Sequence, residues 1–232
     1  KVIIFNDITQ INNNDWEWSN FDTHYQNNEE VPREGMKFNL SEVKPSSKGV
    51  EVSRLLFRSI DKIHVSGLGI NMDIDFTLKE ESSFWVFLRN TDMFDLDTAV
   101  IRISKESESQ RCFISLGTYI KDKQNNCVFK VFTRQQLVDF KKGNSKKFQE
   151  ADVVQVFLSI TDTFEDKISC KVYINNNDTA NEISSDFFLP YTDSCGVMIG
   201  GSGKQVLMRS LRCTCYDKLN SEGGGVHSCD CC

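Results

Sequence analysis

The stretch "INMDIDFTLK", residues 70–79, alternates apolar and polar side chains without a break. Its apolar members are Ile70, Met72, Ile74, Phe76 and Leu78. A period of two over this length is typical of a β-strand with one buried face. Two carboxylates, Asp73 and Asp75, fall on the polar face, so the stretch raises a functional question as well as a structural one.

Comparable short apolar runs recur along the chain and are separated by polar turns. They lie at residues 1–5, 36–40, 53–59, 83–90, 99–104, 111–120, 127–133, 152–160, 167–174, 196–200 and 210–218. Only "RQQLVDFKK", residues 134–142, has its apolar residues at a helical spacing, and it is short. The sequence therefore predicts an all-β chain, a two-sheet antiparallel sandwich with one short helix at 134–142.

Composition restricts the classes of function. The 232 residues are 39% hydrophobic and include 17 phenylalanines, which indicates a folded globule. The net charge is −6, and no stripe of lysine and arginine is interleaved with aromatic residues, so nucleic-acid binding is not expected. The basic run "KKGNSKK" (141–147) is interpreted as a solvated loop, with contact to a polyanion or an acidic glycan as the alternative. No stretch approaches the ~20 apolar residues of a membrane-spanning helix.

No change of composition divides residues 1–219, which are expected to form one domain. Residues 1–35 are polar and are expected to wrap the sandwich, and residues 220–232 form a cysteine-rich tail. The chain begins at Lys1 without a signal peptide and ends in "CDCC". We therefore expect a segment of a longer secreted protein that continues into a cysteine-rich module.

Cysteine usage indicates an oxidising, extracellular setting. The nine cysteines, all expected to take part in disulfides apart from one odd member, are Cys112, Cys127, Cys170, Cys195, Cys213, Cys215, Cys229, Cys231 and Cys232. Two N-glycosylation patterns, at Asn39 and Asn177, fit the same route.

The second half of the chain carries a family resemblance. "KVYINN" (171–176), "VMIGG" (197–201) and "LRCTCYDKL" (211–219) follow one another as strands. They resemble the L-Y-V-N-G, I-G-G and terminal strands of the laminin-G-like, or concanavalin A-like, jelly roll of lectins and glucanases. Asn176 stands where the hairpin glycine is usual, and asparagine tolerates the left-handed conformation that this turn requires. The resemblance is strongest over 152–219 and implies a jelly roll for residues 1–219.

The resemblance also implies that the first strand, "KVIIF", lies beside the last, "LRCTCYD". Cys213 and Cys215 point to one face of that strand, so they are expected to bond to Cys229, Cys231 or Cys232 rather than to each other. Closing such a loop of ~15 residues stabilises a fold by about 3 kcal/mol in the chain-entropy model. A thiolate metal site that includes His227 is the alternative, but zinc sites usually space their cysteines as C-x₂₋₄-C.

Jelly-roll glucanases carry two catalytic glutamates on one strand in an E-x-D-x-x-E pattern, and "NMDID" (71–75) is the nearest approach here. Asp73 matches the middle aspartate, but Asn71 stands at the nucleophile position and no glutamate follows at the acid position. Same-face neighbours on a strand lie roughly 6.5–7 Å apart, which a retaining enzyme could use. Because the residue types do not match, we expect no enzymatic activity and interpret the aspartates as part of a solvated face.

The loop at 89–99, "RNTDMFDLDTA", is the best candidate metal site. Its possible ligands are Asn90, Asp92, Asp95 and Asp97, whose oxygens suit calcium. Sites of this family draw ligands from separate loops, so Asn176 or Asp178 could add another ligand. A solvated acidic loop without metal is the alternative, and no cofactor other than calcium is expected.

Trp16, Trp18 and Tyr25 are the candidate ligand-binding residues, because aromatic side chains stack on sugars and dominate protein interfaces. Alternatively they belong to the core or cover the edge of the sandwich. The sequence as a whole predicts an extracellular or cell-surface adhesion module that binds a protein partner. Lectin-like glycan binding is the second hypothesis, and glycoside hydrolysis is the third.

Overall fold

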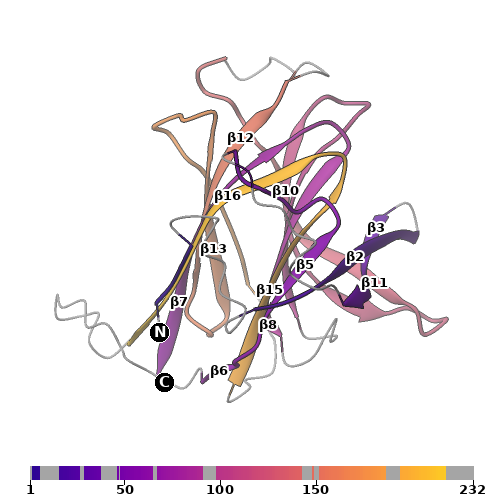
Figure 1. The fold of residues 1–232 in the computed structure, drawn as a ribbon, viewed down its shortest axis with the longest axis vertical. Helices are drawn as coiled ribbons and strands as arrows, with labels where there is room; N and C mark the ends of the chain where they lie inside the picture. The colour runs from indigo at the N-terminus through magenta and orange to yellow at the C-terminus, as the bar shows by residue number, and fades with distance from the viewer. Residues whose placement is uncertain are drawn as a thin grey trace.

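The computed structural model describes residues 2–5, 16–26, 29–37, 46, 48–64, 67–90, 98–142, 148, 152–186 and 194–217. These residues form sixteen β-strands in two antiparallel sheets (Figure 1). The strands are β1 (Val2–Phe5), β2 (Trp16–Gln26), β3 (Glu29–Lys37), β4 (Val50–Glu51), β5 (Leu55–Ser59), β6 (Ile63–His64), β7 (Leu68–Leu78), β8 (Ser82–Asn90), β9 (Ala99–Lys105), β10 (Cys112–Lys121), β11 (Cys127–Gln136), β12 (Val154–Asp162), β13 (Lys167–Ile174), β14 (Asn181–Asp186), β15 (Ser194–Gly203) and β16 (Val206–Asp217). No helix in the described part of the chain is long and apolar enough to cross a membrane.

The seven-stranded sheet has the order β1-β16-β7-β12-β13-β14, and β4 pairs with the beginning of β16. Its two strands furthest apart in sequence are neighbours, with Val2 opposite Thr214 and Phe5 opposite Leu211. The prediction that the first and last strands lie side by side is therefore confirmed. Register within the sheet is uniform apart from one bulge in β16, between Met208 and Ser210.

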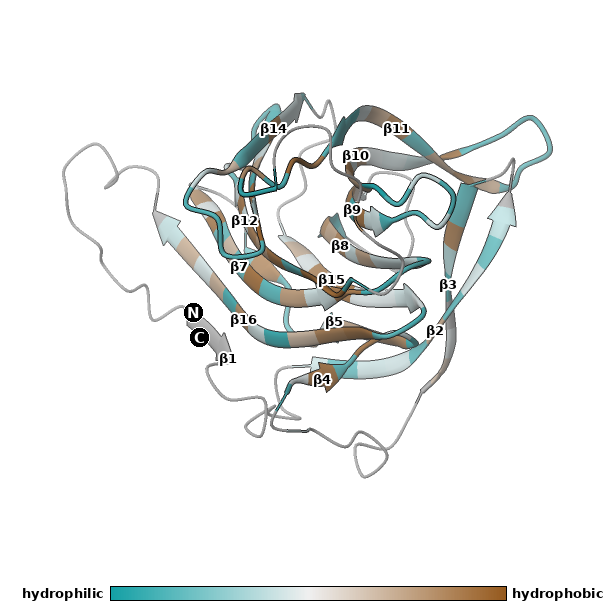
Figure 2. Cartoon of the chain, turned by 90° about the horizontal axis from the view of Figure 1, so that it is seen from above, coloured by the Kyte–Doolittle hydropathy of each residue, from teal (hydrophilic) through white to brown (hydrophobic). Residues whose placement is uncertain are grey.

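The nine-stranded sheet has the order β11-β10-β9-β8-β15-β5-β2-β3, and β6 pairs with β15. Viewed from above it curls until β3, at one edge, comes close to β11, at the other (Figure 2). Hydrogen bonds cross the concave face of the curled sheet. The Arg102 guanidinium of β9 donates to Glu30 Oε2 of β3 at 3.0 Å and to Ser83 Oγ of β8 at 3.2 Å.

The predicted strand at 70–79 is β7, and its alternation matches its burial. Its five apolar side chains are all 0% exposed and face the main core between the sheets. Each fully buried side chain of this size contributes about 1.5–3 kcal/mol relative to exposure. The polar members alternate to the outer face of the seven-stranded sheet, where Asn71 is exposed and Asp73 and Asp75 are half-buried.

β8 is different because all nine of its residues are buried. Phe84, Val86 and Leu88 enter the main core, whereas Trp85 and Phe87 point into a second cluster on the concave face of the curled sheet. This concave cluster consists of Phe21, Val31, Leu56, Trp85, Phe87, Val100, Tyr119, Phe129 and Met198. The concave face is therefore filled by the protein's own aromatic side chains.

An ion pair joins the two sheets. Arg89 at the end of β8 donates to the carboxylate of Asp162 at the end of β12, with Nη2–Oδ1 and Nε–Oδ2 distances of 2.7 and 3.0 Å. The side chains are 8% and 0% exposed, and Arg89 has a left-handed φ of 56°. Because a buried charge must be paired, each partner fixes the other in place.

The structure differs from the sequence-based expectations in two segments. The predicted helix at 134–142 is wrong: residues 134–136 continue β11, and Leu137 N donates to Cys112 O beside it. Asp139 then begins a turn, accepting from Lys141 N at Oδ1 (3.1 Å). Pairing with β10 therefore overrides the helical spacing. Within the segment 1–35, expected as a wrap, residues 16–26 form β2 and residues 29–35 belong to β3, so both are part of the nine-stranded sheet.

No disulfide joins any of the six described cysteines to another. Cys112, Cys170 and Cys213 are buried thiols, and burial raises the pKa of Cys112 and Cys213 to about 12. Cys213 and Cys215 are both buried on the inner face of β16, as alternation predicts. Cys229, Cys231, Cys232 and His227 lie outside the described residues, so the C-terminal disulfide clamp stays a prediction.

Candidate functional site

Of the four predicted calcium ligands on the loop at 89–99, only Asn90 lies in the described part of the chain. Asn90 ends β8 and is 3% exposed, with its Nδ2 near Met198 Sδ at 3.9 Å. Asn176 and Asp178 follow β13 at the opposite end of the sandwich, beside the beginning of β12. Asp92, Asp95 and Asp97 lie outside the described residues. Among the residues that are described, no group of three His, Cys, Asp or Glu side chains is placed to hold a metal ion.

The three predicted ligand-binding aromatics differ in exposure. Trp16 and Trp18 of β2 are only 2% and 4% exposed, and the Trp18 ring packs on Phe57 with centroids 3.8 Å apart. Their rings are therefore not available for stacking on a ligand, and the alternative role as core residues applies. Tyr25, near the end of the same strand, is 78% exposed.

The two aspartates of β7 lie on the outer face of the seven-stranded sheet. Asp75 pairs with Arg209 of β16, whose Nη2 and Nε donate to Oδ1 at 2.6 and 3.1 Å. Asn71 Oδ1 accepts from Thr161 Oγ1 at 3.1 Å. Asp73 lies opposite Arg212 and Ser159. The prediction of a solvated polar face fits this arrangement, with the addition that Asp75 lines a pocket.

This outer-face pocket has a volume of about 390 Å³. It is lined by Asp75, Gln155, Val156, Phe157, Tyr173, Asn176, Asn177, Asp178 and Arg209. The register explains why they meet: Asp75 of β7 lies opposite Phe157 of β12, which lies opposite Tyr173 of β13. A row of side chains thus crosses neighbouring strands, which are about 4.8 Å apart.

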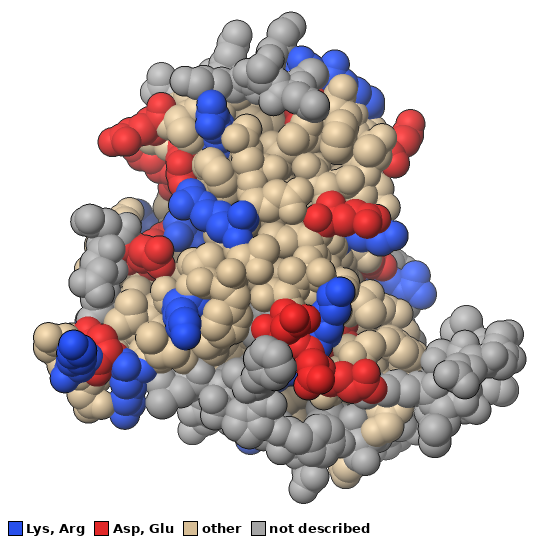
Figure 3. Space-filling model, turned by 180° about the vertical axis from the view of Figure 1, so that it is seen from behind, with Lys and Arg blue, Asp and Glu red and all other residues tan. Residues whose placement is uncertain are grey.

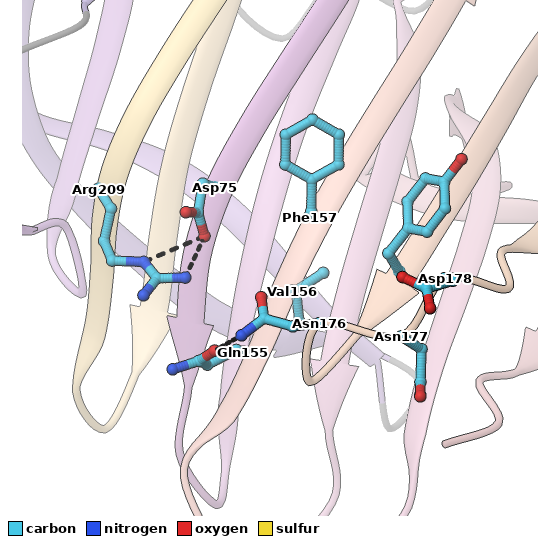
Figure 4. Close-up of a pocket in the computed structure, with 9 residues that line it drawn as sticks. Asp75, Gln155, Val156, Phe157, Asn176, Asn177, Asp178 and Arg209 are labelled. Atoms are coloured by element: carbon cyan, nitrogen blue, oxygen red, sulfur yellow. Dashed lines mark hydrogen bonds and ion pairs between the residues drawn. The ribbon is translucent and has the colours of Figure 1, made fainter. Parts of the chain in front are cut away.

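The row has an apolar centre and polar ends. Phe157 is 40% exposed, and its ring meets that of Tyr173 edge-on, with centroids 5.9 Å apart and an interplanar angle of 62°. Arg209 occupies the bulge of β16 at one end of the row, and bulges typically re-aim a side chain in this way. Figure 4 shows Arg209 and Asp75 on one side of Phe157, with Asp178 and Asn177 on the other.

The turn after β13 forms the polar rim of the pocket. Asn175 and Asn176 have φ values of 52° and 56°, which confirms the predicted left-handed turn. The turn is tied to β12 by Asn176 Nδ2, which donates to Gln155 Oε1 at 2.9 Å, and by Gln155 N, which donates to Asn175 Oδ1 at 3.1 Å. Asn176 therefore projects towards the pocket from a fixed backbone.

Asp139, which follows β11 and is 4% exposed, holds the same turn from behind. Its carboxylate accepts from Asn175 Nδ2 at 2.7 Å and from Asn177 Nδ2 at 2.9 Å. Burial acts to raise the pKa of the Asp139 carboxyl, but these bonds and those from the backbone N–H groups of Lys141 and Lys142 lower it below the ordinary 3.8. The carboxylate is thus ionised when it binds the rim.

The two predicted glycosylation positions have different outcomes. Asn39 lies outside the described residues. Asn177 is 6% exposed, and its Nδ2, the atom to which a glycan would be attached, is the donor to Asp139. In this structure the side chain of Asn177 serves the pocket rim and is not presented at the surface.

Sequence reasoning missed most of the pocket. Phe157 stands on the polar side of "VQVFLSI", where a single aromatic among polar alternates is a usable signal for an exposed ring. Arg209 carries no local signal of its own, and Asp139 falls within the segment 134–142 whose spacing predicts a helix. Their roles depend on a bulge and on contacts between distant segments, which no local pattern reports.

Charge does not gather into one patch on the face of the molecule shown in Figure 3. Basic and acidic side chains are interspersed there, with wide areas that carry neither. With a net charge of −6, this arrangement gives a polyanion no extended basic surface on that face.

Comparison with known proteins identifies the fold. The lectin UEA-II, solved with galactose, matches over 93% of this chain and 98% of its own, with a TM-score of 0.50 and 11% identity. A legume lectin-like domain from Entamoeba histolytica has a TM-score of 0.47 and 13% identity, covering 88% of this chain and 90% of its own. A β-glucanase from Bacillus licheniformis has a TM-score of 0.45 and 14% identity, covering 89% and 95%.

No protein-family model matches the chain, and no curated protein sequence matches it. The chain has the concanavalin A-like jelly-roll fold, as the sequence resemblance predicts. At this level of identity the likeness establishes the fold and leaves the ligand to be argued from the site.

Proposed function

We propose that this protein is a carbohydrate-binding module of lectin type and that the outer-face pocket is its binding site. The single observation that carries the proposal is the half-exposed Phe157–Tyr173 pair with hydrogen-bonding groups at both ends. A sugar ring has one apolar face and a rim of hydroxyl groups, so an aromatic platform flanked by polar side chains is complementary to it.

Preorganisation supports the same conclusion. The Asp139 bonds and the Gln155 bonds hold the rim before any ligand arrives, so little entropy is lost on binding. The concave cluster supports the same conclusion, because the aromatic rings of Trp85 and Phe87 there are 0% exposed and cannot stack on a sugar. We infer binding without hydrolysis, because Asn71 stands where the glucanase nucleophile would be and no glutamate follows at the acid position.

The test is a glycan array probed with the wild type, Phe157→Ala and Phe132→Ala. Phe132 of β11 is 41% exposed, against 40% for Phe157, so it is a matched control outside the pocket. We expect the glycans bound by the wild type to be lost in Phe157→Ala and retained in Phe132→Ala. Equal binding by all three proteins would contradict the assignment of this pocket. Release of reducing sugar from a bound glycan would instead make the protein a hydrolase.

Protein-partner adhesion is the second candidate. The observation that favours it is the hairpin of β2 and β3, where Tyr25 is 78% and Met36 is 83% exposed. Tyrosine and methionine are enriched at interfaces. Loss of cell or receptor binding in the double variant Tyr25→Ser, Met36→Ser, with glycan binding intact, would support this role.

The proposed setting is extracellular, in a larger protein, with residues 1–219 as the domain and 220–232 as the beginning of a cysteine-rich tail. The cysteine-rich sequence supports this proposal. Calcium on the loop at 89–99 is part of the same proposal. A rise in melting temperature with millimolar calcium is the expected result, and an unchanged melting temperature would remove calcium from the account.

A further inference from the structure

The ion pair at one end of the outer-face pocket is arranged asymmetrically. Arg209 Nη2 and Nε both donate to the same oxygen, Asp75 Oδ1, at 2.6 and 3.1 Å. No described residue donates to Asp75 Oδ2, and Nη1 of Arg209 makes no hydrogen bond within the described structure. Both residues line the pocket (Figure 4). The pair therefore leaves one acceptor, Asp75 Oδ2, and one donor, Arg209 Nη1, which lies on the side of the guanidinium away from Asp75.

The pair is also accessible. The side chains of Arg209 and Asp75 are 33% and 28% exposed. They lie in the same row as Phe157, which is directly opposite Asp75 on the neighbouring strand. A ring resting on Phe157 thus places its substituents next to the pair.

We propose that the pocket recognises a neutral pyranose through two adjacent hydroxyl groups, one donating to Asp75 Oδ2 and the other accepting from Arg209 Nη1. Adjacent ring hydroxyls lie about one hydrogen-bond length apart, so one of them can reach each partner of the ion pair. Hydrogen bonds to charged groups are the stronger ones, so this pair supplies specificity that the aromatic platform lacks. The inference rests on the proposed function, since it names the sugar chemistry of the same site.

The other end of the pocket sets the charge of the ligand. Asp178 lies beyond Phe157, so carboxylates stand at both ends and only Arg209 is cationic among the lining residues. Since Asp75 already neutralises Arg209, the lining residues offer no unpaired cation to a sugar that bears a carboxylate or sulfate. The preferred ligand is therefore an uncharged hexose.

The experiment removes single hydroxyl groups from the sugar and single charged groups from the protein, and measures how the two changes combine. Methyl hexopyranosides and their 2-, 3-, 4- and 6-deoxy analogues are titrated into the wild type, Asp75→Asn and Arg209→Lys, with affinity measured by calorimetry or NMR. Glu182→Gln is the control, because Glu182 pairs with Lys171 on the same outer face but does not line the pocket. Melting temperature is recorded for each variant, and only folded variants are compared.

We expect two adjacent deoxy analogues to bind the wild type about tenfold to a hundredfold more weakly than the parent sugar. Asp75→Asn and Arg209→Lys should lose about as much affinity for the parent sugar, and should lose little more when the matching hydroxyl is also removed. Glu182→Gln should behave as the wild type. A purely structural role for the pair would shift melting temperature without removing this selectivity.

The inference is overturned if the affinity losses from the substitution and from the missing hydroxyl add up. It is also overturned if the deoxy analogues bind as well as the parent sugar. In either case the proposed function stands as long as Phe157→Ala still abolishes binding. Preferential binding of a uronic acid or a sulfated sugar would also overturn it. If neither the glycan array nor these titrations detect binding to the wild type, the proposed function itself fails.

Discussion

Side chains alternate between the two faces of each sheet, but the outward-facing surfaces of the two sheets differ in burial. On the seven-stranded sheet, β7 buries one face and leaves the other polar, so Asp75 and Phe157 remain accessible. On the nine-stranded sheet, β8 buries both faces, because the sheet curls over Trp85 and Phe87. The curled sheet fills its concave face with side chains that stabilise the fold. The flatter sheet leaves its outer face accessible to a ligand.

The comparison is most strongly tested at Trp85. This side chain is 0% exposed in the concave cluster, its Nε1 donates to Ser202 Oγ at 3.0 Å, and Arg102 lies over its ring at 4.9 Å. Trp85→Ala should lower the free energy of unfolding by about 3–5 kcal/mol in urea denaturation, since it leaves a large cavity and an unpaired hydroxyl. A loss below about 1 kcal/mol would mean that the concave face is open.

Breaking the Arg89–Asp162 ion pair between the sheets should give the next largest loss in the free energy of unfolding. Asp162→Asn leaves Arg89 buried without its counter-charge, so a loss of about 3 kcal/mol is expected. Asp75→Asn removes the exposed pair with Arg209 and should cost less than about 1 kcal/mol. Urea denaturation measures the free energy of unfolding of both variants. Similar losses would contradict the conclusion that the Arg89–Asp162 pair is buried and the Asp75–Arg209 pair is accessible.

Asp139 lies between these extremes, because it is a buried residue that serves the exposed site. Asp139→Asn replaces an acceptor by a donor facing Asn175 or Asn177, and should cost about 1–3 kcal/mol. Glycan affinity should fall as well, because the rim loses its support.

The same residue predicts a pH dependence. Because the folded-state pKa of Asp139 lies below the ordinary 3.8, its contribution is complete above about pH 5 and is lost as the pH falls through the folded-state value. Asp139→Asn should therefore lose less stability than the wild type between about pH 5 and pH 2. Parallel acid-denaturation curves for the two proteins would show that the Asp139 carboxylate does not hold the rim.

The smallest effect on stability belongs to Phe157. Since 40% of this residue is already exposed, Phe157→Ala should change the free energy of unfolding by about 1 kcal/mol or less while removing glycan binding. A loss as large as that of Trp85→Ala would place Phe157 in the core and remove the contrast between the two faces. Thermal unfolding alongside Phe132→Ala provides the measurement and its control.

Much of the fold could be predicted from the sequence, because strand burial is a local pattern. The alternation of 70–79 gave β7 and its buried face, and the continuous apolar run at 83–90 gave β8. β2 and β14 were missed, since "WEWSNFDTHYQ" and "NEISSD" have too many polar residues to stand out. The helix at 134–142 failed because pairing with a neighbouring strand decided the structure.

The site could be predicted only in fragments. Asp75 was singled out and Asn176 was placed in a left-handed turn, both from local sequence. Arg209 joins Asp75 through strand pairing between segments 134 residues apart, and Asp139 reaches Asn175 across 36. Such contacts follow from topology, which a single sequence specifies only through its resemblance to a known fold.

The account's central claim is that the ligand binds the outer face of the seven-stranded sheet and not the concave face of the nine-stranded one. NMR titration of the labelled protein with a sugar selected on the glycan array tests this directly. Shifts concentrated at Gln155–Phe157 and Tyr173–Asp178, with an unchanged Trp85 indole signal, are the predicted result. Shifts centred on Trp85 and on β8–β11, with the residues of the outer-face pocket unmoved, would contradict it.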